Sequence, residues 1–106
     1  MITLDEFKKL QLIVAQIKEV KEHPNADKLY VLKIDTGTEE KQIVAGIRLF
    51  YKKEELIGRR VVVVNNLQPA VIRGEESNGM LLAASDEKGI SVLSPDREVK
   101  LGSLVK

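Results

Sequence analysis

The chain contains no cysteine and no tryptophan, and it has only two phenylalanines and two tyrosines. Without cysteine, neither a disulfide nor a thiolate metal site can form, and a cytoplasmic location is expected. The single histidine has no cluster of metal-ligating residues around it, so no metal and no cofactor are predicted. With so few rings, valine, isoleucine and leucine must pack the core, and a base-stacking platform for single-stranded nucleic acid is disfavoured.

Long apolar runs and an excess of one charge are also missing. No run reaches membrane-spanning length, and the N-terminus lacks the basic and apolar segments of a signal peptide, so a soluble protein without a membrane partner is expected. Seventeen Lys and Arg against sixteen Asp and Glu give a net charge of +1. Composition alone therefore does not indicate a nucleic-acid binder, and any basic surface must be produced by folding.

The motifs of catalysis are absent as well. No glycine-rich phosphate loop connects a strand to a helix, and no nucleophile or orienting carboxylate accompanies the histidine. No enzymatic activity is predicted for this chain. A length of 106 residues is suited to one domain covering residues 1–106, because two smaller cores would each bury too little apolar surface.

What the chain does contain is a series of short β-branched segments separated by turn residues. Thr3 is suited to cap a helical turn over residues 5–10, and a second short helix is predicted within 49–58, stopping at a left-handed Gly58. After Leu67-Gln68-Pro69 an irregular loop is predicted up to Gly79, and the last predicted segment of the chain covers 98–105. Turns are expected at 23–27, 36–40 and 85–89, and strands at 12–20, 29–35, 41–45, 59–65, 80–84 and 90–93.

This order predicts an all-β fold. Three strands, a short helix and further strands within about a hundred residues are typical of an OB-fold. The expected architecture is a five-stranded Greek-key barrel with a short helix and extra C-terminal strands. An SH3-like barrel is the nearest alternative.

Three strings carry a family resemblance: His-Pro-Asn-Ala-Asp-Lys-Leu-Tyr at 23–30, Gln-Ile-Val-Ala-Gly-Ile at 42–47, and Glu-Glu-Ser-Asn-Gly-Met-Leu-Leu-Ala-Ala at 75–84. Together they resemble the tRNA-binding domain family, whose members occur in methionyl-tRNA synthetases, in separate tRNA-binding proteins and in synthetase cofactors. The opening at 3–10 is most similar to the C-terminal domain or separate β subunit of methionyl-tRNA synthetase. The resemblance implies an OB-fold, a homodimer formed through the chain ends, tRNA as ligand and the synthetase catalytic subunit as a partner.

The resemblance also implies where the tRNA contacts lie. Residue type alone favours a loop-to-strand joint with Met80 in the core. Ser77 and Met80 belong to a Ser-Asn-Gly-Met motif that the family uses against tRNA, and the match to the whole motif reverses that preference. Basic side chains near this motif could reach phosphates. Asn65 could contact a nucleotide or satisfy backbone groups in a turn. The candidate tRNA contacts are Lys33, Arg73, Ser77, Asn78 and Met80, followed by Lys28, Arg48 and Asn65.

The sequence departs from the family pattern at two places. Residues 12–16 lack the basic side chains usual in the first strand, and Ala-Val-Ile at 70–72 stands where basic residues usually precede Arg73-Gly74. A monomer with fewer cations depends more on the avidity of a dimer. The same departures keep a second function open, because some dimeric members of the family resemble chaperones that hold unfolded polypeptide.

Overall fold

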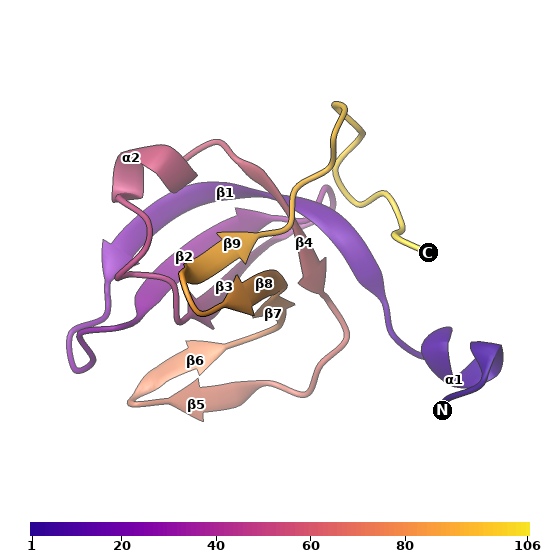
Figure 1. Cartoon of the computed structure of the whole chain (residues 1–106), viewed down its shortest axis with the longest axis horizontal. Coiled ribbons are helices and arrows are strands. Elements are labelled where there is room, and N and C mark those ends of the chain that lie inside the picture. Colours follow the sequence, from indigo (N-terminus) through magenta and orange to yellow (C-terminus); the bar gives the residue numbers. More distant parts are fainter.

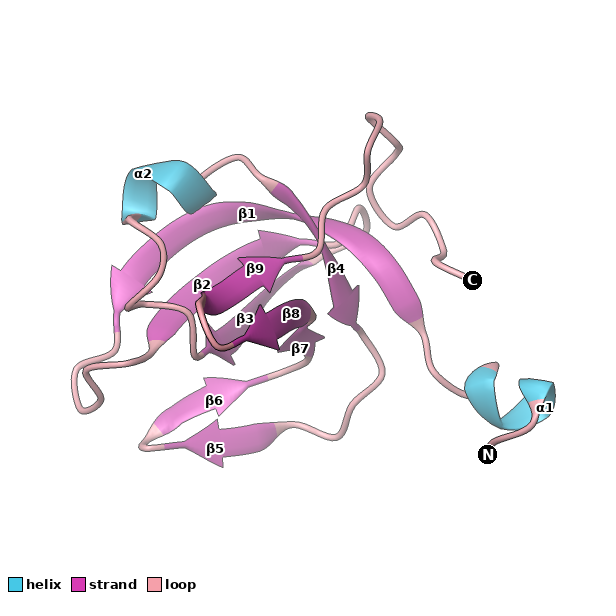
Figure 2. Ribbon diagram, viewed as in Figure 1, coloured by secondary structure: helices cyan, strands magenta, loops and turns pink.

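The computed structural model describes residues 1–106 and consists mainly of antiparallel strands (Figures 1 and 2). Five strands form a sheet in the order β3-β2-β1-β4-β7, and β3 lies close to β7, so that the sheet curls into a nearly closed barrel. This architecture confirms the predicted OB-fold. The elements are α1 (Leu4–Phe7), β1 (Leu12–Glu22), β2 (Tyr30–Asp35), β3 (Glu40–Ala45), α2 (Lys53–Leu56), β4 (Arg60–Val64), β5 (Ala70–Ile72), β6 (Glu75–Ser77), β7 (Met80–Leu81), β8 (Ala83–Asp86) and β9 (Gly89–Val92).

Aliphatic side chains fill the barrel, as the scarcity of rings requires. Alternate residues of each strand point inward, so Leu32 and Ile34 of β2 and Val61 and Val63 of β4 are fully buried. Leu56 of α2 closes one end of the same cluster. No helix in the structure is long and apolar enough to cross a membrane.

The predicted N-terminal cap is confirmed, but the helix is shorter than predicted. The Thr3 hydroxyl accepts from the Glu6 backbone N–H at 3.1 Å, and the Glu6 carboxylate accepts from the Thr3 N–H at 3.1 Å, forming a reciprocal capping box. The helix ends at Phe7 rather than at residue 10. Beyond it the Asn66 amide donates to the Lys9 carbonyl and accepts from the Gln11 N–H, both at 2.7 Å, which draws the chain into β1.

The prediction of an irregular loop up to Gly79 was wrong in one respect, because this stretch contains the β5–β6 hairpin. Arg73 and Gly74 both have positive φ, 53° and 95°, as a two-residue hairpin turn requires. The turn is unusual because an arginine occupies a position that asparagine or glycine normally takes. The paired strand Glu75-Glu76-Ser77 is too polar to be recognised from apolar alternation.

Other element boundaries also differ from the prediction. The first strand extends to Glu22 with a register shift after Ile17, and the stretch 80–84 divides at Leu82, whose N–H bonds to β4 while its carbonyl accepts from Leu93. The following β8–β9 hairpin supplies the predicted extra C-terminal strands. Segment 98–105 contains only one bridge, between Ile13 and Leu104.

Candidate nucleic-acid interface

His23 connects the turn at 23–27 to the β5–β6 hairpin. Its side chain is only 3% exposed, and its Nδ1 accepts a hydrogen bond from the Asn25 backbone N–H at 2.9 Å. The proton of the neutral ring therefore lies on Nε2, which donates to the Ile72 carbonyl at 2.9 Å. The histidine thus satisfies two backbone groups that lie 47 residues apart along the chain.

Asn25 and Arg73 form a second connection between the same segments. The Asn25 side-chain amide donates to the Arg73 carbonyl at 3.3 Å, and the Arg73 guanidinium donates to the Asn25 carbonyl at 3.1 Å. The rest of the Arg73 side chain is exposed. The strained hairpin tip is therefore held against the turn, with cationic donors left free for a ligand.

The base of the hairpin is fixed to β3 through Ser77. This residue is 5% exposed, and its hydroxyl accepts from the Val44 N–H at 3.0 Å while donating to the Gly79 carbonyl at 3.1 Å. The Gln42 side chain extends the joint by donating to the Glu76 carbonyl at 2.9 Å. The structure therefore gives Ser77 a positioning role, because its hydroxyl is already engaged on both sides.

The remaining residues of the Ser-Asn-Gly-Met motif are arranged differently. The backbone N–H of Asn78 donates to the Gln42 carbonyl at 2.8 Å, while its half-buried side chain makes no hydrogen bond within the chain. Gly79 has a φ of 129°, and a Cβ there would lie 3.0 Å from the Val64 carbonyl oxygen. Met80 is 47% exposed at the rim of an apolar groove of 320 Å³ between β3 and β7. Asn78 and Met80 are therefore available to a ligand.

Lys33 lies on the outward face of the sheet. It stands opposite Glu19 of β1, and the two side chains approach to 3.8 Å, with Lys33 still 45% exposed. An exposed ion pair at this distance is weak, so a phosphate can compete with Glu19 for the ammonium group. Lys33 therefore remains a candidate contact.

The three secondary candidates have different surroundings. Lys28 is exposed on the turn before β2 and has no ionic partner within 4.0 Å. Arg48 is held by the Glu22 carboxylate and by the Ala26 carbonyl at 3.2 Å. Lys28 is thus free for a ligand, whereas Arg48 braces the turn.

Asn65 is the third secondary candidate, and its amide is fully engaged. The Lys41 ammonium donates to the backbone carbonyl of Asn65 at 2.9 Å and to its side-chain Oδ1 at 2.7 Å. The side-chain Nδ2 of Asn65 donates to the Gln11 side-chain oxygen at 2.7 Å. Of the two interpretations of this asparagine, the structure favours the satisfaction of internal polar groups.

The ionisation of Glu22 is shifted by two neighbouring cations. The hydrogen bond from Lys53 and the positive charge of Arg48 hold the pKa of its carboxyl group below the usual range. Lys53 lies 3.2 Å away on α2, so Glu22 links the end of β1 to that helix and to the segment after β3. Two of the basic side chains near the turn are therefore committed to a carboxylate.

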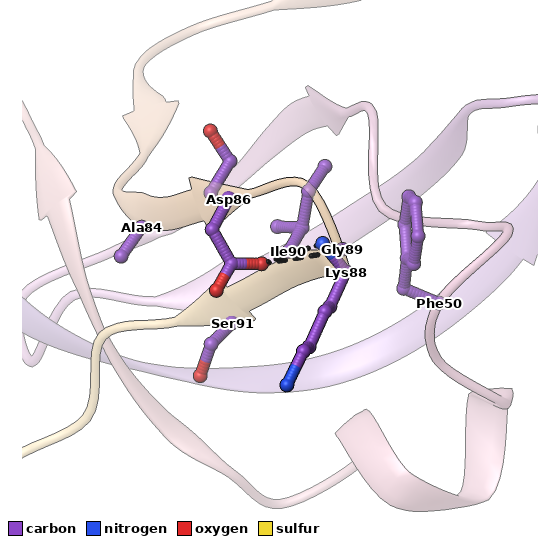
Figure 3. Close-up of a pocket in the computed structure, with 8 residues that line it drawn as sticks. Phe50, Ala84, Asp86, Lys88, Gly89, Ile90 and Ser91 are labelled. Carbon is purple, nitrogen blue, oxygen red and sulfur yellow. Dashed lines mark hydrogen bonds between the residues drawn. The ribbon is translucent and has the colours of Figure 1, made fainter.

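An open cavity of 470 Å³ borders the β8–β9 hairpin, where Phe50 lies beside the turn at Gly89 (Figure 3). The Asp86 carboxylate accepts from the backbone N–H groups of Lys88 and Gly89 at 2.8 and 3.2 Å, which stabilises the turn. None of the eight candidate contacts lines this cavity. It is therefore separate from the turn and hairpin described above.

Sequence reasoning treated residues 23–27 as a structural turn and did not single out Gln42. The structure agrees about the turn and shows what it supports, namely the hairpin that carries Arg73. No local signal identifies Gln42 as a brace, because its partner at Glu76 is 34 residues away. Asn25 and Gln42 are positioning residues that only the folded chain reveals.

These features define an OB-fold domain in which the first loop and the hairpin between the last barrel strands meet at one edge, where barrels of this class bind their ligands. Residues 12–104 match the family described as "Putative tRNA binding domain". The chain belongs to this family.

Relatives and solved structures agree with this assignment. Methionine–tRNA ligase of Thermococcus kodakarensis is 53% identical over 105 residues, which are 99% of this chain and 14% of the ligase. A methionyl-tRNA synthetase related protein of Pyrococcus horikoshii superposes with a TM-score of 0.93 at 36% identity, covering 100% of this chain and 98% of the other. The chain thus corresponds to about one seventh of the ligases it matches, and the rest of those enzymes lies outside it.

A second similar structure carries a different description. The chaperone CsaA of Bacillus anthracis superposes with a TM-score of 0.90 at 28% identity, covering 100% of this chain and 99% of the other. The same fold therefore occurs in a protein described as related to methionyl-tRNA synthetase and in a protein described as a chaperone.

Proposed function

We propose that this domain binds tRNA without catalysing a reaction, using the edge formed by the turn at 23–28 and the β5–β6 hairpin together with the outward face of β2. The observation that carries the proposal is the pair of opposed hydrogen bonds between Asn25 and Arg73. They hold an exposed guanidinium beside the turn that bears Lys28, and Lys33 lies further along β2.

Binding of this kind follows the shape of the RNA rather than its base sequence. Lysine and arginine contact phosphates, and an amide such as that of Asn78 can bond a phosphate or a 2′-hydroxyl. Met80 adds an exposed apolar contact at the same edge.

The domain acts as an accessory to methionyl-tRNA synthetase, as its C-terminal domain or as a β subunit. Extra tRNA contacts raise the local concentration of substrate without altering the chemical step. The kinship with methionine–tRNA ligases supports this partner. Addition of the domain to a synthetase catalytic unit should lower the KM for tRNA more than it changes kcat.

A homodimer formed through the chain ends is part of the same proposal. Its support is the exposure of several large apolar side chains within the first ten and last fourteen residues, which a second copy of the chain could cover. Sedimentation of the wild type should give a dimer, and Leu4→Glu should shift it toward monomer. The group comprises Met1, Ile2, Leu4, Leu10, Leu93 and Leu104.

The decisive experiment is titration of several tRNAs at increasing salt concentrations. The proposal expects binding of many tRNA species that weakens steeply with salt, and a reduced affinity for Lys33→Gln/Arg73→Asn. Lys52→Gln/Lys88→Gln removes the same charge from the N-cap of α2 and from the β8–β9 turn, and serves as the matched control. Absence of tRNA binding by the wild type at low salt would disprove the proposal.

A second candidate function is the binding of unfolded polypeptide. The groove of 320 Å³ between β3 and β7 is lined almost entirely by apolar residues, including the flexible Met80, and CsaA has the same fold. Capture of an unfolded model protein, with no tRNA binding in the same buffer, would favour this function over the first.

A further inference from the structure

A second basic site lies on the barrel, away from the turn and hairpin. An open cleft of 580 Å³ is bordered by the start of β4, by Gly58 and by the segment 94–98. Three arginines line it, Arg59, Arg60 and Arg97, together with the carboxylates of Asp96 and Glu98. Apart from Gly58 and Pro95, every residue lining the cleft is polar or charged.

Two of the arginines are held in place by uncharged groups. The Arg59 Nε donates to the Glu55 carbonyl at 3.2 Å, and its guanidinium lies 5.5 Å from the centre of the Tyr51 ring. The Arg60 Nη1 donates to the Val99 carbonyl at 2.5 Å. Guanidinium groups oriented in advance lose less side-chain entropy when a ligand binds, so both are suited to hold a phosphate.

The positive charge of the cleft is incompletely neutralised. Arg60 approaches Glu98 at 3.5 Å, but the Glu98 side chain is 85% exposed, and such a pair contributes little. Arg59 and Arg97 have no carboxylate within 4.0 Å. A phosphate can replace Glu98 with stronger, charge-assisted hydrogen bonds.

Strand register connects this cleft to Lys33. Gln16 of β1 pairs with Asp35 of β2 on one side and with Arg60 of β4 on the other. Gln16 and Arg60 line this cleft, and Asp35 and Arg60 line a second open cleft that adjoins it. Lys33 is two residues from Asp35 and therefore points to the same side of the sheet. From strand spacing and rise, the Cα atoms of Lys33 and Arg60 are roughly 12 Å apart across this face.

We infer that the cleft of Arg59, Arg60 and Arg97 binds phosphates of the RNA backbone, extending the path of a tRNA from Lys33 across β1 to the segment after β9. This inference rests on the proposed function, because it adds contacts to a bound tRNA. Two carboxylates between Lys33 and the cleft already have partners, Glu19 at Lys33 and Asp35 at the Gly37 N–H at 2.8 Å. Within the cleft, the three arginines outnumber the carboxylates of Asp96 and Glu98.

The test compares the salt dependence of tRNA affinity in three variants. Arg59→Gln/Arg97→Gln leaves Arg60 to hold the C-terminal segment, and it should make the slope of log affinity against log salt shallower by about one to two. Arg59→Lys/Arg97→Lys should restore most of the slope, because the charge returns. Lys8→Gln/Lys9→Gln removes the same charge from the end of α1 and should leave the slope close to that of the wild type.

Two results would overturn the inference. One is an unchanged slope in Arg59→Gln/Arg97→Gln while Lys33→Gln/Arg73→Asn still weakens binding, which would leave the proposed function intact. The other is an equal loss in the α1 control, which would show a general effect of net charge. Failure of the wild type to bind tRNA at all would instead disprove the proposed function. Melting temperatures of the variants within about 2 °C of the wild type establish that the fold is preserved.

Discussion

Asn25 and Arg73 are 48 residues apart in the chain and hold each other through two opposed hydrogen bonds, each using one side chain and one backbone carbonyl. The arrangement offsets the cost of placing an arginine at a φ of 53°. It also fixes a cation at the edge where the first loop meets the hairpin. The candidate interface is therefore a tertiary joint between two turns rather than a property of either one.

Arg73→Asn should separate stability from binding. Asparagine adopts positive φ more readily than arginine does, so we expect the free energy of unfolding, measured with urea, to remain within about 0.5 kcal/mol of the wild type. The tRNA affinity should fall about 3- to 10-fold, because one phosphate contact is lost. A large loss of stability would show that the guanidinium bond to Asn25 outweighs the strain.

His23→Phe should destabilise the domain by about 2–4 kcal/mol. The ring fills a similar buried space, but the Asn25 N–H and the Ile72 carbonyl both lose their partner. Urea unfolding gives the change in free energy, and amide exchange should accelerate first in residues 70–77. Unaltered exchange in the hairpin would indicate that Asn25 and Ser77 hold it without the histidine.

Ser77→Ala should mainly reduce stability, whereas Met80→Ala should mainly reduce tRNA affinity. The alanine at 77 leaves the Val44 N–H without an acceptor in the interior, so a loss of about 1–3 kcal/mol is expected. The exposed Met80 should cost less than about 1 kcal/mol when truncated, while tRNA affinity falls. If Ser77→Ala weakened binding without affecting unfolding, the serine would contact RNA directly.

Glu22→Gln should change the pH dependence of stability. Because the pKa of Glu22 is lower in the folded chain, its contribution to stability is present above the ordinary glutamate pKa of about 4.3 and is lost as pH falls through the lower folded value. Wild type and variant should therefore differ in urea unfolding above about pH 5 and converge in strong acid. High salt should reduce the difference, since the group is exposed.

Much of the fold could be predicted because it depends on local chemistry. Thr3 caps its helix and Gly58 adopts a φ of 87°, as residue type and position indicated. The strands with alternating or continuous aliphatic residues were located correctly. The β5–β6 hairpin was missed because its second strand reads Glu-Glu-Ser and its turn contains an arginine, so neither alternation nor turn chemistry identified it.

The candidate site was predictable only in part. Family motifs directed attention to residues 23–30 and 75–84. The structure places the start of the first stretch against residues 72 and 73 of the hairpin and joins the second stretch to β3 and β4. It also shows that residues of similar chemistry have different surroundings, since the Ser77 hydroxyl and the Asn65 amide are engaged internally while Met80 is exposed. Residue type cannot distinguish these cases, because the partners lie 24 to 54 residues away.

By itself, the sequence determined the core faces, the caps, most of the turns and the family, because each depends on residues within a few positions of one another. The tertiary structure decided which polar groups remain free. Net charge is almost balanced, so the availability of a cation depends on where folding places the carboxylates. Glu22 engages Arg48 and Lys53, whereas no carboxylate reaches Lys28, Arg59 or Arg97.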